Sequence, residues 1–148
     1  MDHDGLLAQV RATYQALDPV PAEVLAAARA ALAWRRPGAE LAELTGDHAG
    51  QAGAVRGTPA RTLTFTARDT VIEMEIAGTG REREIAGRLA PPSPARVHVR
   101  HPELPPGGPE THADDTGHFA LPAIPEGLVS LLFHLPDGTS IVTSWIRL

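Results

Sequence analysis

The sequence predicts a mainly β protein, in which residues 39–148 form an antiparallel β-sandwich domain and residues 1–38 form a segment of two N-terminal α-helices. Two observations indicate the sandwich. Short segments that alternate apolar and polar residues recur through residues 84–145, each bounded by Gly, Pro or Asp. The chain also has 14 Gly and 14 Pro among 148 residues, which is typical of a protein with many turns. A different spacing of apolar residues near the N-terminus indicates the helices.

The first helix is predicted over residues 3–17. Asp4 can cap its start, and the pair Asp18-Pro19 ends it. Its large apolar residues recur at helical spacing and therefore share one side of the helix: Leu6, Val10, Tyr14 and Leu17, with Leu7 beside them.

The second helix is predicted from Pro21 to about Arg36. Proline suits a first helical turn because its φ is already helical, and Pro37-Gly38 ends the helix. Six alanines lie between Ala22 and Ala31. Because alanine buries little area, we expect these helices to be only marginally stable by themselves.

The strands are predicted from alternation and from apolar runs between turn residues. Residues 40–45 are interpreted as a strand that leads into the sandwich, and the Gly- and Ala-rich residues 46–60 as a flexible loop. Further strands are predicted over 61–67, 70–77, 84–89, 95–101, 118–121, 128–135 and 140–147.

Within this pattern, three large side chains are predicted to lie in the sandwich core: Phe119, Leu131 and Phe133. Gly117 and Gly127 are predicted at turns that need a backbone conformation which other residues adopt with strain.

Composition and charge argue against several classes of function. A net charge of −5 argues against general nucleic-acid binding, and the absence of Cys excludes a disulfide framework and thiol catalysis. No apolar run approaches the roughly 20 residues of a membrane span, and the acidic start lacks the basic region of a signal peptide. A cytoplasmic protein without a membrane partner is therefore expected. All 13 basic residues are Arg, a bias typical of GC-rich actinobacterial genomes.

The segment from Ile85 to Leu135 resembles the carboxypeptidase regulatory-like domains, which are transthyretin-like β-sandwiches. The residues that carry the resemblance are IAGRL at 85–89, ARV at 95–97, THADDTGHF at 111–119, LPAIPEG at 121–127 and VSL at 129–131. In that family a D-x-x-G-x-F turn places Gly at positive φ and Phe in the core, roles that fit Asp114 or Asp115, Gly117 and Phe119. The resemblance implies the fold, and it implies an accessory role because such domains are usually non-catalytic.

The whole layout, two Ala-rich helices, an ELAEL segment and a sandwich ending in TSWI, is similar to that of a group of small actinobacterial proteins. Members of that group are encoded beside extracytoplasmic-function sigma factors and caspase-like CHAT proteases. This similarity implies a regulatory or adaptor role.

Seven histidines raise the question of a metal or catalytic site. His98 and His101 are predicted on opposite faces of one strand, whereas His98 can share a face with His118 if their strands are neighbours. Zinc needs three or four converging ligands, so surface histidines are the favoured interpretation and no catalytic residue, cofactor or metal is predicted. The alternative is a small enzyme or a ligand- or metal-binding sandwich. Convergence of His98, His112 and His118 would favour that alternative.

A non-enzymatic protein-binding module is the favoured function. Its partner is expected at the helices, since low-stability elements are where binding surfaces tend to lie. The predicted contact residues are Leu6, Val10, Tyr14, Leu25, Leu32 and Trp34. Trp145 is the other tryptophan, a residue type that often dominates the binding energy of interfaces, although packing in the core is favoured for it.

Overall fold

The chain divides into two compact units, Met1–Pro37 and Gly38–Leu148. Their bounds differ by one residue from those of the predicted segments, 1–38 and 39–148. The computed structural model describes residues 3–17, 19–33, 35–49, 60–78, 80–105 and 107–148.

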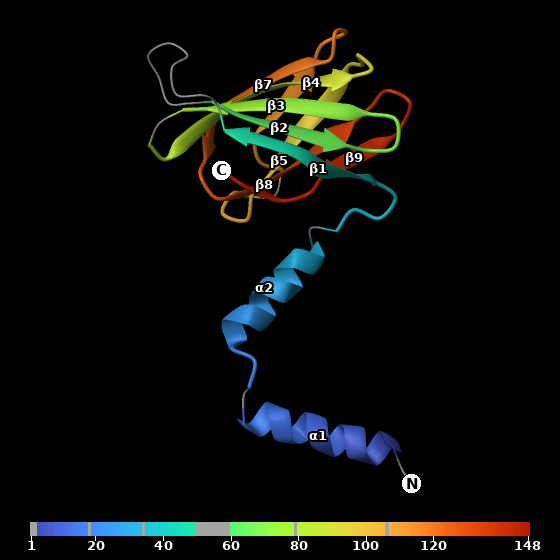
Figure 1. The fold of residues 1–148 in the computed structure, drawn as a ribbon, viewed down its shortest axis with the longest axis vertical. Helices are drawn as coiled ribbons and strands as arrows, with labels where there is room; N and C mark the ends of the chain where they lie inside the picture. Colours follow the sequence, from blue (N-terminus) through green and yellow to red (C-terminus); the bar gives the residue numbers. More distant parts are fainter. Residues whose placement is uncertain (1–2, 18, 34, 50–59, 79, 106) are drawn as a thin grey trace. The chain divides into compact units, whose positions relative to one another are not determined.

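The first unit contains α1 (His3–Leu17) and α2 (Ala22–Ala33) (Figure 1). The bounds of α1 agree with the prediction. At the start of α2, the carbonyl oxygen of Pro21 accepts hydrogen bonds from the N–H groups of Val24 (3.0 Å) and Leu25 (3.2 Å), so proline does open the first turn.

The second unit is built from strands alone among its described residues. The strands are β1 (Glu40–Ala49), β2 (Arg61–Thr66), β3 (Val71–Ala77), β4 (Glu82–Ala90), β5 (Ala95–Arg100), β6 (Glu110–Ala113), β7 (His118–Pro125), β8 (Leu128–His134), β9 (Ser140–Thr143) and β10 (Ile146–Arg147). They form one 10-stranded sheet in the order β6-β5-β8-β9-β1-β2-β3-β4-β7, with β10 paired to β8. The protein is therefore mainly β, as predicted.

The sheet is mixed and nearly closed, which differs from the purely antiparallel arrangement expected. β1 pairs antiparallel with β2 but parallel with β9. The two ends of the strand order, β6 and β7, are consecutive strands, and the turn between them is closed by a bond from the N–H of Asp114 to the carbonyl of His118 (2.9 Å). Seven strands lie between β1 and β9 in the chain, so no tight turn joins them and imposes antiparallel pairing.

The core is a single cluster of buried apolar side chains, to which every strand of the sheet contributes. The ring of Phe119 on β7 meets that of Phe133 on β8 edge to face, with centroids 5.4 Å apart, although these strands are not neighbours in the sheet. Phe119, Leu131 and Phe133 are buried, which confirms their predicted place in the core.

Three strand predictions were wrong. β1 continues through residues 46–49, which were predicted as loop, because β2 supplies its hydrogen bonds and Arg61 on β2 forms an ion pair with Asp47 (2.7 Å). The rest of that predicted loop, residues 50–59, lies outside the described residues. β6 was not predicted, since four residues are too few to show a pattern. The single strand predicted over 140–147 is divided into β9 and β10.

Candidate functional site

The apolar stripe of α1 is open to solvent. Leu6, Val10 and Tyr14 expose 60%, 44% and 70% of their surface, and Leu7 and Leu17 are exposed as well. At 100° per residue these five side chains fall within an arc of about 100°, which is the width of a helix face that normally packs against something. A shallow open hollow at one edge of this stripe is lined by Leu6, Gln9, Val10, Thr13 and Tyr14. We call the five large apolar residues Leu6, Leu7, Val10, Tyr14 and Leu17 the α1 stripe.

The remaining predicted contact residues belong to α2 and its end. Leu25 is exposed, as is its neighbour Val24. Of Leu32 only the backbone is described, and Trp34 lies outside the described residues.

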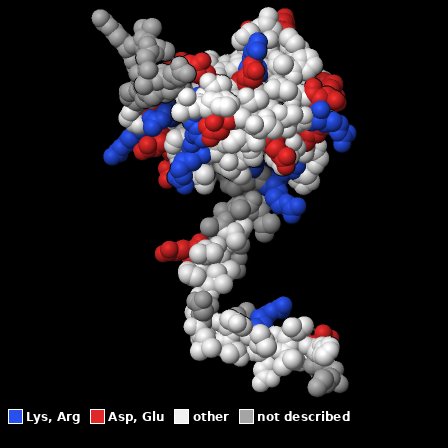
Figure 2. All heavy atoms as spheres, in the orientation of Figure 1, with Lys and Arg blue, Asp and Glu red and all other residues white. Residues whose placement is uncertain are grey.

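The helices carry few charges. α1 has Asp4 in its first turn and no basic residue in its last turn. On the strand unit, by contrast, Figure 2 shows both signs interspersed. No helix in the described part of the chain is both long and apolar enough to cross a membrane. Interfacial membrane helices are usually rich in Lys and Arg on the polar face, whereas Arg11 is the single such residue in the sequence of α1.

Trp145 does not lie in the core, contrary to the favoured prediction. It keeps 39% of its surface exposed, and the guanidinium carbon of Arg100 lies 5.1 Å from its ring centroid, a cation–π arrangement. Arg100 itself is only 6% exposed and donates to the hydroxyl of Ser130 (3.4 Å). The reason for the error is that the strand ends at Thr143, so the alternation predicted through Trp145 does not continue.

Three polar side chains form a cluster on the outer face of β5 and β6: Arg96, His98 and Glu110. Arg96 approaches one oxygen of Glu110 through Nε (3.2 Å), and His98 approaches the other oxygen through Nδ1 (3.3 Å). Arg96 also contacts Nε2 of His98 through Nη2 (3.1 Å). Because a guanidinium can only donate, Nε2 accepts this bond, and the proton of the neutral ring is on Nδ1, facing Glu110. Both ring nitrogens of His98 are therefore engaged.

The three histidines whose convergence was to favour a metal or catalytic site have different partners. His112 pairs with Arg96 across β6 and β5. His118, on β7, contacts the hydroxyl of Thr116 through Nδ1 (2.8 Å). Among the described residues, no three His, Asp or Glu side chains gather closely enough to hold a metal ion.

The turn before His118 is organised by Asp114. One carboxylate oxygen accepts bonds from the N–H of Thr116 (2.9 Å), from its hydroxyl (2.5 Å) and from the N–H of His118 (3.0 Å). The hydroxyl bond of Thr116, followed by the N–H bond of His118, lowers the pKa of Asp114. Since the Thr116 hydroxyl donates to Asp114, Nδ1 of His118 must donate to Thr116. Of the two adjacent aspartates, Asp114 is thus the one that caps this turn.

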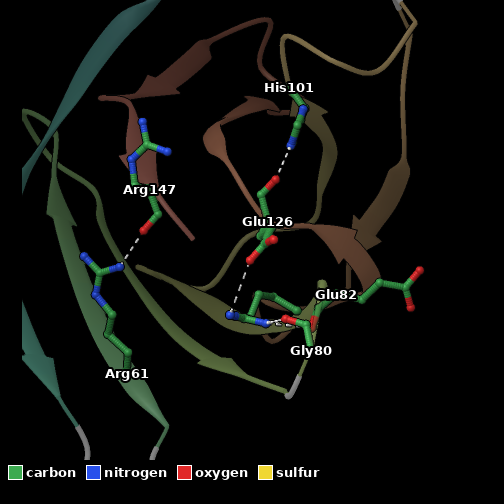
Figure 3. A network of polar contacts seen from close by, with 7 residues as sticks. Arg61, Gly80, Glu82, His101, Glu126 and Arg147 are labelled. Atoms are coloured by element: carbon green, nitrogen blue, oxygen red, sulfur yellow. Dashed lines mark hydrogen bonds and ion pairs between the residues drawn. The ribbon is translucent and has the colours of Figure 1, made fainter.

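His101 is only 1% exposed, whereas it was predicted at the surface. Its Nδ1 accepts the N–H of Glu103 (3.1 Å), so its Nε2 carries the proton and donates to the carbonyl of Glu126 (3.2 Å; Figure 3). The ring also lies against Gly127, where an added Cβ would be 3.1 Å from Nε2. His101 therefore fastens the loop after β5 to the turn between β7 and β8.

Two arginines complete this end of the strand unit (Figure 3). Arg83 donates to the carbonyl of Gly80 (2.6 Å) and lies 4.0 Å from a carboxylate oxygen of Glu126. Arg61 donates to the carbonyl of Arg147 (2.7 Å) while its other nitrogens hold Asp47, which lowers the pKa of Asp47. These contacts tie turns and the last strand together, and they are explained by stability alone.

The sequence interpretation missed the group around Glu110. The signal was present in the strand at residues 95–101, where Arg96, His98 and Arg100 alternate with buried Val97 and Val99 and must share the outer face. What the alternation did not show was which strands lie beside β5.

Comparison with protein-family models, with curated proteins and with solved structures finds no match to this chain. The fold and the exposed α1 stripe define the class to which the protein belongs, a small mainly β protein with an apolar helical extension.

Proposed function

We propose that this protein is a non-enzymatic, cytoplasmic adaptor module that binds a protein partner through the α1 stripe. The observation that carries the proposal is the exposure of Leu6, Val10 and Tyr14 on one side of a helix. Five large apolar side chains, each worth about 1.5–3 kcal/mol when fully buried, give a stabilisation comparable to the cost of association of about 4–15 kcal/mol.

The mode of binding is that of an amphipathic helix in a partner's groove. We propose Tyr14 as the main contributor to binding energy, because tyrosine is among the residues that most often dominate it, and this side chain is exposed. Exposed Leu25 extends the surface along α2, and the proposed contact also includes Leu32 and Trp34.

For the strand unit we propose a transthyretin-like sandwich of the carboxypeptidase regulatory-like kind. Three features support this proposal: Asp114 caps the turn, Gly117 has φ 83°, and Phe119 is buried. On this basis the strand unit is a scaffold. The partner classes proposed from the second resemblance are a sigma factor and a CHAT protease, in a regulatory system.

The test compares three full-length proteins: wild type, Val10→Asp on the α1 stripe and Ala12→Asp on another side of the same helix. Both substitutions add one negative charge, and Ala12→Asp costs more helix propensity than Val10→Asp, since alanine is the best helix former and valine is close to aspartate. Each protein captures partners from the native host, which mass spectrometry identifies, and binding is then measured with the purified partner, beginning with sigma factors and CHAT proteases.

We expect Val10→Asp to weaken binding at least about tenfold, because a charge would be buried in an apolar contact, and Ala12→Asp to bind like the wild type. Equal binding of all three proteins would show that the partner does not use the α1 stripe.

A further inference from the structure

We propose that Arg96, His112 and His134 form a binding site for the phosphoryl group of a small phosphate monoester on the outer face of β5, β6 and β8. This site is separate from the α1 stripe and does not depend on the function proposed for it.

The three side chains stand in one row across three strands. Arg96 is the direct partner of His112 on β6 and of His134 on β8. Residues that face each other on neighbouring antiparallel strands point to the same side of the sheet. Arg96 is exposed while its neighbour Val97 is buried, so that side is the outer one. On β9, Ser140 extends the row, and its hydroxyl lies 2.9 Å from Nδ1 of His134.

The row gathers a permanent cation, Arg96, with two imidazoles whose ring N–H groups can donate to an anion. Glu110 contributes one negative charge, which Arg96 and His98 already share. The ring of His134 also packs edge to face against His98, with centroids 5.4 Å apart, so the imidazoles are close together. A bound anion would accept hydrogen bonds from these donors.

Donors remain available in the row. Arg96 directs Nε toward Glu110 and one Nη2 hydrogen to His98, which leaves three of its five N–H donors without a partner among the described residues. His112 is exposed and is not held by any hydrogen bond in the described part of the chain, and His134 uses Nδ1 for Ser140, so its Nε2 is left for a ligand.

An open surface depression of about 350 Å³ lies beside the row. Besides the three side chains it is lined by Pro94, Ala95, Ala113, Leu135 and Pro136. Its size is at the lower end of small-molecule sites, about 300–1,000 Å³. A phosphoryl group offers three acceptor oxygens and up to two charges, one oxygen for each side chain, whereas a carboxylate offers two oxygens and one charge. The apolar walls suit the short organic part of a monoester.

The charged groups around the row include Arg96 and Glu110, with Asp137 in the turn after β8. Asp137 accepts the N–H of Thr139 (2.8 Å), which lowers its pKa.

The experiment is an NMR titration of the full-length, ¹⁵N-labelled protein with glycerol 3-phosphate, inorganic phosphate and acetate as separate probes. We expect glycerol 3-phosphate to shift the imidazole signals of His112 and His134, to bind more tightly than phosphate, and to bind far more tightly than acetate. The double variant His112→Gln/His134→Gln should bind at least about tenfold more weakly, while His118→Gln on β7 should bind like the wild type.

Dispersed amide spectra will show that the variants are folded. Unchanged affinity of the double variant, or acetate binding as tightly as the monoester, would overturn the proposal. So would an absence of shifts at about 10 mM monoester, where a site with a Kd of about 1 mM is mostly filled. Inorganic phosphate binding as tightly as the monoester would overturn the assignment of a monoester in favour of the free anion. Val10→Asp should bind the monoester normally, which separates this test from that of the α1 stripe.

Discussion

The turn between β6 and β7 requires glycine at position 117. Its φ is 83°, and a Cβ added there would lie 2.6 Å from the carbonyl oxygen of Leu89. Left-handed backbone costs an ordinary residue about 1–2 kcal/mol, and here the collision with β4 adds to that cost. We therefore expect Gly117→Ala to lower the urea midpoint by the equivalent of more than about 2 kcal/mol.

Gly138 provides a matched control, because it has a similar φ of 88° but no atom within 4 Å of an added Cβ. Gly138→Ala should show the backbone cost alone. If the two variants were equally stable, the contact with Leu89 would be unimportant.

A second prediction at the residue scale concerns Asp114 and pH. Hydrogen bonds from the hydroxyl of Thr116 and the N–H of His118 lower its pKa in the folded protein. An unfolded chain holds its aspartates at about pKa 3.9 and so binds more protons below that pH, which makes this contribution present above about pH 4 and lost as the pH falls further. Asp114→Asn should therefore destabilise the protein at pH 7, and the difference from the wild type should shrink at pH 3.

Urea unfolding at both pH values measures this effect, with Asp115→Asn as the control, since Asp115 is the adjacent acid of the same turn. A difference between wild type and Asp114→Asn that is as large at pH 3 as at pH 7 would mean that the amide substitution acts by changing the turn geometry rather than by removing charge.

At the scale of elements, β8 and β9 are joined by a side chain where their regular pairing ends. The pairing runs from His134–Ser140 to Leu132–Val142. One residue further on, the N–H of Leu131 donates to the hydroxyl of Thr143 (2.9 Å), and the hydroxyl of Ser130 donates to the carbonyl of Thr143 (2.8 Å). Thr143 is buried, so this hydroxyl replaces a backbone acceptor.

Thr143→Val keeps the shape of the side chain and removes that acceptor. The buried N–H of Leu131 then loses its partner, and we expect a loss of about 1–3 kcal/mol in the free energy of unfolding. Thr62→Val on β2, where the side chain is exposed, should change stability by less than about 0.5 kcal/mol. A loss of the same size in both variants would contradict the role of the hydroxyl.

At the scale of the whole molecule, the strand unit should fold without the helices. Every residue of the described core cluster lies at or after Ala42, and the unit Gly38–Leu148 is compact. We expect a protein lacking residues 1–38 to give a dispersed amide spectrum and a single cooperative urea transition.

The same truncated protein should fail to bind the partner of the α1 stripe while still binding the phosphate monoester. A truncated chain that unfolds would show that the helices contribute to the core. One that folds and still binds the protein partner would place the partner site on the strand unit.

The sequence by itself determined the local structure where the physics is local. Helical spacing of Leu6, Val10 and Tyr14 predicted α1, and the resemblance of residues 111–119 to a D-x-x-G-x-F turn placed Gly117 at a positive φ, which glycine adopts without strain. Alternation predicted the core position of Phe119, since a period of two assigns each residue of a strand to one face.

Only the tertiary structure decided which strands lie side by side. The parallel pair of β1 and β9, the burial of His101 and the row of Arg96, His112 and His134 all depend on that order. The physical reason is that the period of a strand gives the face of a side chain, while its cross-strand neighbours come from segments far away in the chain, brought together by packing of the whole core. The α1 stripe follows from one helix, and the proposed phosphoryl site exists only once three strands are adjacent.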